Sequence, residues 1–234
     1  MAYTTCRCPS LLAAPVLGLL LFLTADVLLA QVPQAPSPTT QPRYLYAHPA
    51  TGFAFPSRME KFSCRCITFY DEDRDVSADY KWPGRADLNV YVYPAPASTT
   101  GPTFKLNDKG ELLLDSQPGH VFQLNEPSAS FVEHFAECKQ QVLDRGKDWK
   151  HVRDSRMQAD PERDGPISYL AMFENDAQQQ YSELYLFVVK GHFVKIRKTC
   201  SSADSLASLT TVLRYLEWPA GAGGKPKDAK AARP

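Results

Sequence analysis

Short segments of alternating apolar and polar residues, separated by turn signals, run through most of this chain and restrict it to a fold built on strands. The clearest segment is Leu88–Tyr93, where Leu88, Val90 and Val92 would share one face before Pro94 ends the pattern. Successive side chains of a strand point to opposite faces. The period of two therefore predicts a half-buried strand.

Similar segments, bounded by polar or glycine-containing turns, predict several further strands. The stretches at 72–75 and 190–192 are short and polar, so each would join its neighbouring segments as a hairpin. The predicted strands cover residues 52–56, 62–71, 76–82, 151–157, 167–173, 182–189 and 193–199, and a small hairpin pairs 104–106 with 111–114.

Two segments change from a period of two to a helical period. The first carries Phe131, Phe135, Cys138 and Val142, and the second, capped within 202–204 and ended by Trp218-Pro219, carries the apolar residues Leu206, Leu209, Val212, Leu213 and Leu216. Such spacing gives each helix one apolar stripe. We therefore predict an α+β domain, with an antiparallel sheet of hairpins covered by two main amphipathic helices.

The first 30 residues have the order of a secretory signal peptide. Arg7 precedes the apolar run 11–23, and Ala25 and Ala30 are candidate cleavage positions. The alternative is a membrane anchor over residues 11–30, which is long enough to span a bilayer. Pro15 and the cost of burying Asp26, about 3 kcal/mol at a helix centre, favour cleavage. We expect a periplasmic or secreted protein.

Composition divides the rest of the chain into three parts. Residues 31–43 form a proline-rich spacer, 44–219 a single domain, and 220–234 a basic tail that lacks apolar residues to bury and is predicted to be disordered. The whole chain has 26 Lys and Arg against 26 Asp and Glu. This balance argues against a general nucleic-acid binder.

Four cysteines remain after the leader: Cys64, Cys66, Cys138 and Cys200. In an exported domain they are predicted to form disulfides, with all three pairings open. Cys64 and Cys66 would share one face of a strand, so thiolate binding of copper(I) or zinc is an alternative. No paired two-residue gaps support a metal site, and no cofactor is predicted.

Alternating carboxylates in the segment 71–75 resemble the start of a calcium loop. Asp71, Asp73 and Asp75 could converge on one cation, but Val76 replaces the required glycine and Trp82 the required glutamate. A solvated hairpin tip is the favoured interpretation.

Lys195 and Arg197 would share one strand face, opposite Val194 and Ile196. The favoured interpretation is that they form the wet side of a half-buried sheet, or an edge protected by charge. As the alternative, they are the candidate contacts for an anionic ligand or partner. Tyr91 and Tyr93 could similarly form either an aromatic floor for a ligand or part of the core.

Three patches resemble the PsbP family of extrinsic photosystem proteins and its relatives among exported proteins of Gram-negative bacteria. They are Gly52–Pro56, Leu88–Pro94, and the closing run from Val194 to Cys200 that leads into the last helix. The resemblance spans residues 44–218. It implies a PsbP-like fold and no active site.

Taken together, these features favour an exported, non-catalytic binding or accessory module whose partner is a protein of the cell envelope. A hydrolase is the first alternative, with an acid/base pair such as Asp71 or Glu174 acting with His192. A carrier of a metal or small molecule is the second. No nucleophile motif settles the question of catalysis.

Overall fold

The computed structural model describes residues 3–5, 44–70, 74–108, 112–113, 123–160, 165–201, 208–219 and 222. The spacer lies outside these residues, as do most of the predicted leader and tail and the aspartates Asp71 and Asp73. In the described chain, no helix is long and apolar enough to cross a membrane.

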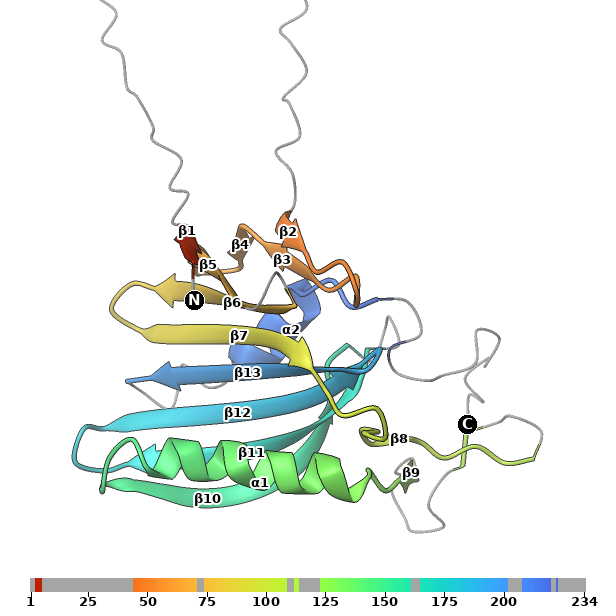
Figure 1. The fold of residues 1–234 in the computed structure, drawn as a ribbon. Helices are drawn as coiled ribbons and strands as arrows, with labels where there is room; N and C mark the ends of the chain where they lie inside the picture. Colours follow the sequence, from red (N-terminus) through yellow and green to blue (C-terminus); the bar gives the residue numbers. More distant parts are fainter. Residues whose placement is uncertain are drawn as a thin grey trace, which may run out of the picture.

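One antiparallel sheet of nine strands organises the molecule (Figure 1). Its main path runs β1-β5-β6-β7-β13-β12-β11-β10, and β4 pairs with β5 beside that path. The strands are β1 (Tyr3–Thr5), β4 (Arg58–Met59), β5 (Phe62–Tyr70), β6 (Asp75–Trp82), β7 (Ala86–Pro94), β10 (Trp149–Gln158), β11 (Ile167–Asn175), β12 (Gln180–Val189) and β13 (His192–Cys200).

Within the described residues, two small ribbons and two helices complete the fold. The ribbons pair β2 (Tyr44–Ala47) with β3 (Ala54–Pro56), and β8 (Thr103–Phe104) with β9 (Leu124–Asn125). The helices are α1 (Ala129–Leu143) and α2 (Ser208–Tyr215). Of the expected small hairpin, the described residues contain one bridge between Leu106 and Leu112, while Phe104 pairs with Leu124 of β9 instead.

Strand alternation follows the sequence closely. Leu88, Val90 and Val92 are fully buried on one face of β7, as predicted. The hairpin between β12 and β13 turns through Lys190 and Gly191, both with positive φ (47° and 73°). Two such residues match the turn type whose twist suits a tight hairpin, which explains the glycine.

The two faces of the sheet carry separate apolar clusters. The first face, with Leu88 and Ile196, packs against Phe53, Phe55 and the buried residues of α2 and its following turn. The second face packs against the apolar stripe of α1, which is Phe131, Phe135, Cys138 and Val142 as predicted. The two clusters explain why α1 and α2 lie on opposite sides of the sheet (Figure 1).

The predicted α+β class with two main helices is wrong: the described part of the protein is mostly β, with 54% of its residues in strands and 13% in helices. Helix α2 has eight residues and reaches only part of its face. The remaining cover comes from aromatic residues at the start of the domain, including Phe53 and Phe55. The alternating residues of this segment indicated a strand, but not that the strand would lie outside the large sheet and cover its face.

Helix α1 spans only part of the second face. Its buried side chains contact residues of β11, β12 and β13, and on β7 the cluster extends to the ring of Tyr93. Within the described residues, no helix covers the same face of β5, β6 and most of β7. This leaves an open half-face in which polar residues line up across neighbouring strands.

Candidate functional site

The open half of the second face is built by strand register. Tyr91 on β7 lies opposite Lys195 on β13, and Asn89 lies opposite Arg197. Residues that pair directly across strands share a face. The two cations therefore stand next to the aromatic and amide side chains of β7, and all four are half-buried.

Lys195 lies above two aromatic rings. Its Nζ is 4.9 Å from the centroid of Tyr91 and 5.6 Å from that of Tyr93. An ammonium group over a ring face is attracted by the ring quadrupole, which offsets part of its lost hydration. The rings of Tyr91 and Tyr93 therefore lie beneath Lys195, whereas Tyr80 is buried in the first apolar cluster. A floor for a ligand stays a prediction.

Arg197 makes one directional contact. Its Nε donates a hydrogen bond to Ser182 Oγ at 3.2 Å. Burial and the nearby Arg145, on the turn after α1, lower the pKa of Arg197 to about 10. Two neighbouring guanidinium groups repel each other, so the site favours an incoming negative charge.

We call Lys195, Arg197, Arg145, Tyr91 and Tyr93 the cationic face. Among the described residues, none of its three cations has a carboxylate within ion-pair distance. Burying part of a cation costs free energy unless an opposite charge accompanies it. The cationic face is therefore electrostatically incomplete.

Two carboxylates of β6, Asp75 and Asp79, border the cationic face. Burial raises the pKa of Tyr93, and the charge of Asp75 contributes to raising it. Asp79 accepts hydrogen bonds from Asn89 Nδ2 and from the Cys66 thiol, the latter at 3.3 Å. Asn89 separates Asp79 from Arg197 in the row across the strands. The Asp79 carboxylate therefore accepts hydrogen bonds from neutral donors and does not pair with Arg197.

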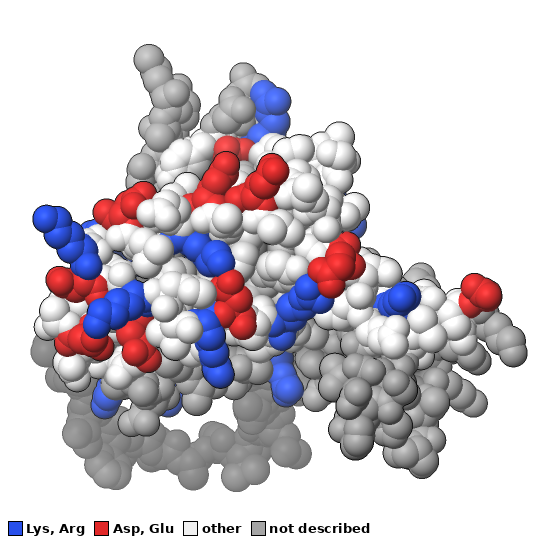
Figure 2. Space-filling model, turned by 90° about the horizontal axis from the view of Figure 1, so that it is seen from below, with Lys and Arg blue, Asp and Glu red and all other residues white. Residues whose placement is uncertain are grey.

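The charges around α1 and β10 are arranged differently. Seen from below, Lys and Arg are interspersed with Asp and Glu (Figure 2). Lys139 pairs with Asp154 at 2.7 Å and Arg156 pairs with Glu126 at 2.7 Å. These residues lie at or near a shallow groove of about 320 Å³ between α1 and β10. Because its cations are already paired, this groove lacks the unmet charge of the cationic face.

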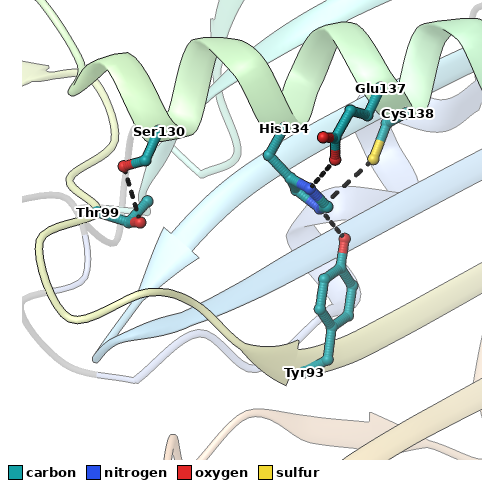
Figure 3. A network of polar contacts seen from close by, with 6 residues as sticks. All are labelled: Tyr93, Thr99, Ser130, His134, Glu137 and Cys138. Atoms are coloured by element: carbon teal, nitrogen blue, oxygen red, sulfur yellow. Dashed lines mark hydrogen bonds and ion pairs between the residues drawn. The ribbon is translucent and has the colours of Figure 1, made fainter.

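A second polar cluster adjoins the cationic face at Tyr93 (Figure 3). His134 Nε2 lies 2.7 Å from Tyr93 Oη and 3.6 Å from Cys138 Sγ. His134 Nδ1 lies 3.1 Å from Glu137 Oε2. Residues three and four apart on a helix share a face, which is how α1 groups these side chains.

A thiol, an imidazole and a carboxylate in series resemble the parts of a cysteine hydrolase. However, Cys138 is only 2% exposed, so a substrate carbonyl has no path to its sulfur. Burial also raises the pKa of this thiol, which disfavours the nucleophilic thiolate. The arrangement therefore does not support nucleophilic catalysis.

The four predicted disulfide cysteines lie on three elements. Cys64 and Cys66 are on β5, Cys138 is on α1, and Cys200 ends β13. All four are thiols in the structure, and no two of the described cysteines lie at disulfide distance. Their pairing stays a prediction.

The prediction that Cys64 and Cys66 share a face is wrong. A β-bulge at Arg65 pairs Cys64 with Tyr80 but Cys66 with Asp79, and these partners are consecutive residues of β6. Cys64 therefore packs at the first face, while Cys66 reaches Asp79 on the second. One inserted residue shifts the alternation by one, which a simple count of two cannot detect.

The other predicted sites do not come together. Glu174 pairs with Tyr181 of β12, which in turn pairs with Cys200 at the last position of β13. His192 is the first residue of β13, at the opposite end of the strand. A Glu174–His192 acid/base pair therefore has no geometric support, and Asp71 lies outside the described residues. His192 instead lies beside His48, with ring centroids 5.1 Å apart.

Sequence reasoning placed Lys195, Arg197, Tyr91 and Tyr93 correctly on their strands but missed Arg145, Asp79 and the His134 cluster. Arg145 follows α1 in the chain and joins the site only through the packing of that helix. The one available signal was the spacing of His134, Glu137 and Cys138 on a predicted helix.

Fold and site together define a class of molecule: an antiparallel sheet, half covered on one face by a helix, with an open cationic half beside it. Comparison with protein-family models, curated proteins and solved structures gave no match. The resemblance to the PsbP family stays a prediction, so the argument for function depends on the geometry of the site.

Proposed function

We propose that this protein is an exported, non-catalytic binding module whose cationic face holds an acidic segment of a partner protein. The observation that carries the proposal is the absence of a carboxylate within ion-pair distance of Lys195, Arg197 and Arg145 in the described part of the chain. A partner's carboxylates would supply the missing charge.

The geometry suits carboxylates. The Nε of Arg197 is held by Ser182, and its two Nη groups have no hydrogen-bond partner among the described residues. A guanidinium presents planar, paired donors that match a carboxylate. Lys195 adds a point charge, and Tyr91 adds an aromatic surface beside it. An extended acidic segment could contact all three along the strands.

A fluorescein-labelled oligoglutamate peptide tests this proposal by fluorescence anisotropy with the full chain. Arg197→Gln and Lys195→Gln should each weaken binding by about tenfold or more, because a charged hydrogen bond contributes about 1.5–3 kcal/mol. Added salt should weaken binding further. Lys105→Gln, which removes an exposed cation on another part of the molecule, should leave affinity unchanged.

Two results would contradict the proposal. Equal loss in Lys105→Gln and Arg197→Gln would indicate non-specific attraction to the whole surface. Saturable binding of inorganic phosphate at Arg197 without peptide binding would instead favour a carrier of small anions.

A further inference from the structure

The outer edge of β10 takes no part in the proposed function. Strand β10 is the last strand of the sheet path, and no other strand of the described residues pairs with its outer side. Residues 150–156 are exposed on both faces of the strand, and pairing with β11 is regular from Arg153 to Gln158. We infer that β10 pairs with β10 of a second copy of this chain, antiparallel and centred on Ser155, to form a symmetric dimer.

The groove between α1 and β10 reaches this edge. Its lining includes three consecutive residues of β10, Asp154, Ser155 and Arg156. Neighbouring side chains of a strand point to opposite faces, so a groove that touches all three extends to the edge between the faces. An edge strand presents a row of backbone N–H and C=O groups there, which another extended chain can pair with.

The charges of β10 are complementary to themselves about Ser155. In an antiparallel pair of identical strands, the two-fold axis passes between two copies of one residue, because directly opposed side chains share a face. With Ser155 on the axis, Asp154 of each copy faces Arg156 of the other, which gives two equivalent ion pairs. Both side chains are accessible, with exposed fractions of 44% and 36%.

Neighbouring centres are less favourable. An axis at Arg153 or Arg156 would oppose two guanidinium groups, and an axis at Asp154 would oppose two carboxylates. Like charges directly opposite each other are destabilising. An axis at Val152 would fall on the β-bulge, where the edge is irregular. Charge and backbone together therefore favour the centre at Ser155 over these alternatives.

The ion pairs within each copy are compatible with this contact. Asp154 binds Lys139 through one carboxylate oxygen, and each oxygen can accept more than one hydrogen bond. Arg156 contacts Glu126 and Tyr169 through a single Nη group, and a guanidinium carries further N–H donors. The cross-copy pairs would thus extend these ion pairs into a network without breaking them.

Helix α1 adds an apolar contact across the axis. It runs alongside β10 (Figure 1), and Val132 and Ala136 line its side of the groove. Val132 is 45% exposed although it is apolar. The axis is perpendicular to the sheet, so both copies of α1 would stand on the same side of the joined sheet. The second copy would then cover Val132, as expected for the centre of an interface.

Charge reversal tests the pairing. Size-exclusion chromatography with light scattering on the purified full chain should give a dimer mass. Asp154→Arg and Arg156→Asp should each raise the dimer dissociation constant by at least about a hundredfold, because each places two like-charge pairs at the contact. An equal mixture of the two variants should recover dimers, since every facing pair again has opposite charges. Lys105→Glu, at an exposed position outside β10, should keep the wild-type mass.

A cysteine on the axis tests the register independently of charge. Ser155→Cys would place two thiols on residues whose Cα atoms are about 4.5–5.5 Å apart, which is within the range of a disulfide. Mild oxidation should give a covalent dimer that the wild-type chain, with its native cysteines, does not form. Lys150→Cys lies on the same strand away from the axis and should not cross-link.

Three results would overturn the inference: a wild-type chain that is monomeric at every concentration measured, a dimer that both folded charge variants leave intact, or a lack of cross-linking through Ser155→Cys. Circular dichroism checks the folding of each variant, and the cysteine result decides if a charge variant unfolds. None of these positions belongs to the cationic face, so oligoglutamate binding is tested separately.

Discussion

At the scale of single residues, Glu183 holds a carboxyl group inside the first face of the sheet. Its side chain is 5% exposed, and Oε2 has no hydrogen-bond partner among the described residues. Lys198, fully buried, lies opposite it on β13. Burial raises the pKa of Glu183 to about 7, against the opposing effects of Lys198 and of a hydrogen bond with Tyr185.

This carboxyl group predicts an unusual dependence of stability on pH. Between its ordinary pKa of 4.5 and about 7, the folded chain keeps a proton that the unfolded chain has released. The free energy of unfolding should therefore fall by about 3 kcal/mol as pH rises through this window, and stay lower above it. Urea denaturation at several pH values measures the effect.

Glu183→Gln should remove that slope, because glutamine does not titrate. The slope is the quantity to compare, since the substitution also changes the surroundings of Lys198. Glu133→Gln, at an exposed position of α1, is the control and should keep the wild-type slope. Parallel curves for wild type and Glu183→Gln would show that another group is responsible.

Residues on single strands were predictable where period-two alternation holds without interruption. Lys195 and Arg197 were placed on the face opposite Val194 and Ile196 from the sequence alone, and the burial of Val194 and Ile196 confirms it. The side chains opposite them were not predictable, because register between strands depends on turns and bulges.

At the scale of elements, Ser128 connects α1 to the loop that precedes it. Its Oγ accepts a hydrogen bond from Phe131 N at 3.4 Å and another from Thr100 N at 3.0 Å. The first helical N–H groups have no partner within the helix, so an N-cap oxygen stabilises the helix start. Helix α1 in turn carries His134 and positions the turn with Arg145.

Ser128→Ala should lower the free energy of unfolding by about 1 kcal/mol, up to about 2 if the contact to Thr100 adds to the cap. Ser128→Asp keeps an acceptor at the cap and should remain close to wild type. Urea unfolding at neutral pH compares the three proteins. Equal stability of Ser128→Ala and wild type would mean that solvent replaces the cap fully.

Most elements followed from local patterns, but their roles did not. The strands over β5–β7 and β10–β13 and the buried stripe of α1 agree with the sequence-based expectation. We did not predict that the segment with Phe53 and Phe55 would cover part of the sheet together with the two helices. Apolar alternation indicates that a face is buried without identifying what buries it.

At the scale of the whole molecule, the predicted leader overlaps the sheet. Strand β1 pairs Tyr3–Thr5 with Ile67–Phe69 of β5, although these first residues belong to the predicted signal peptide. If the leader is removed, the mature sheet loses β1 from its path.

N-terminal sequencing of the chain recovered from the periplasm of a Gram-negative host tests this prediction. We expect the first residue to follow Ala25 or Ala30, as the apolar run and small residues indicate. Recovery of an intact chain beginning at Met1 from the membrane fraction would instead support an anchor over residues 11–30.

The pairing of β7 with β13 also determines when the cationic face can exist. Strands β5–β7 and strands β10–β13 each pair with their neighbours in the sequence. The ladder that pairs Tyr91 with Lys195 instead joins segments roughly a hundred residues apart. Such long-range pairing is slow to form. Tyr91 and Lys195 stand on opposite sides of that ladder. We therefore expect folding intermediates with either meander alone to lack affinity for acidic segments, so that ligand binding reports completed folding.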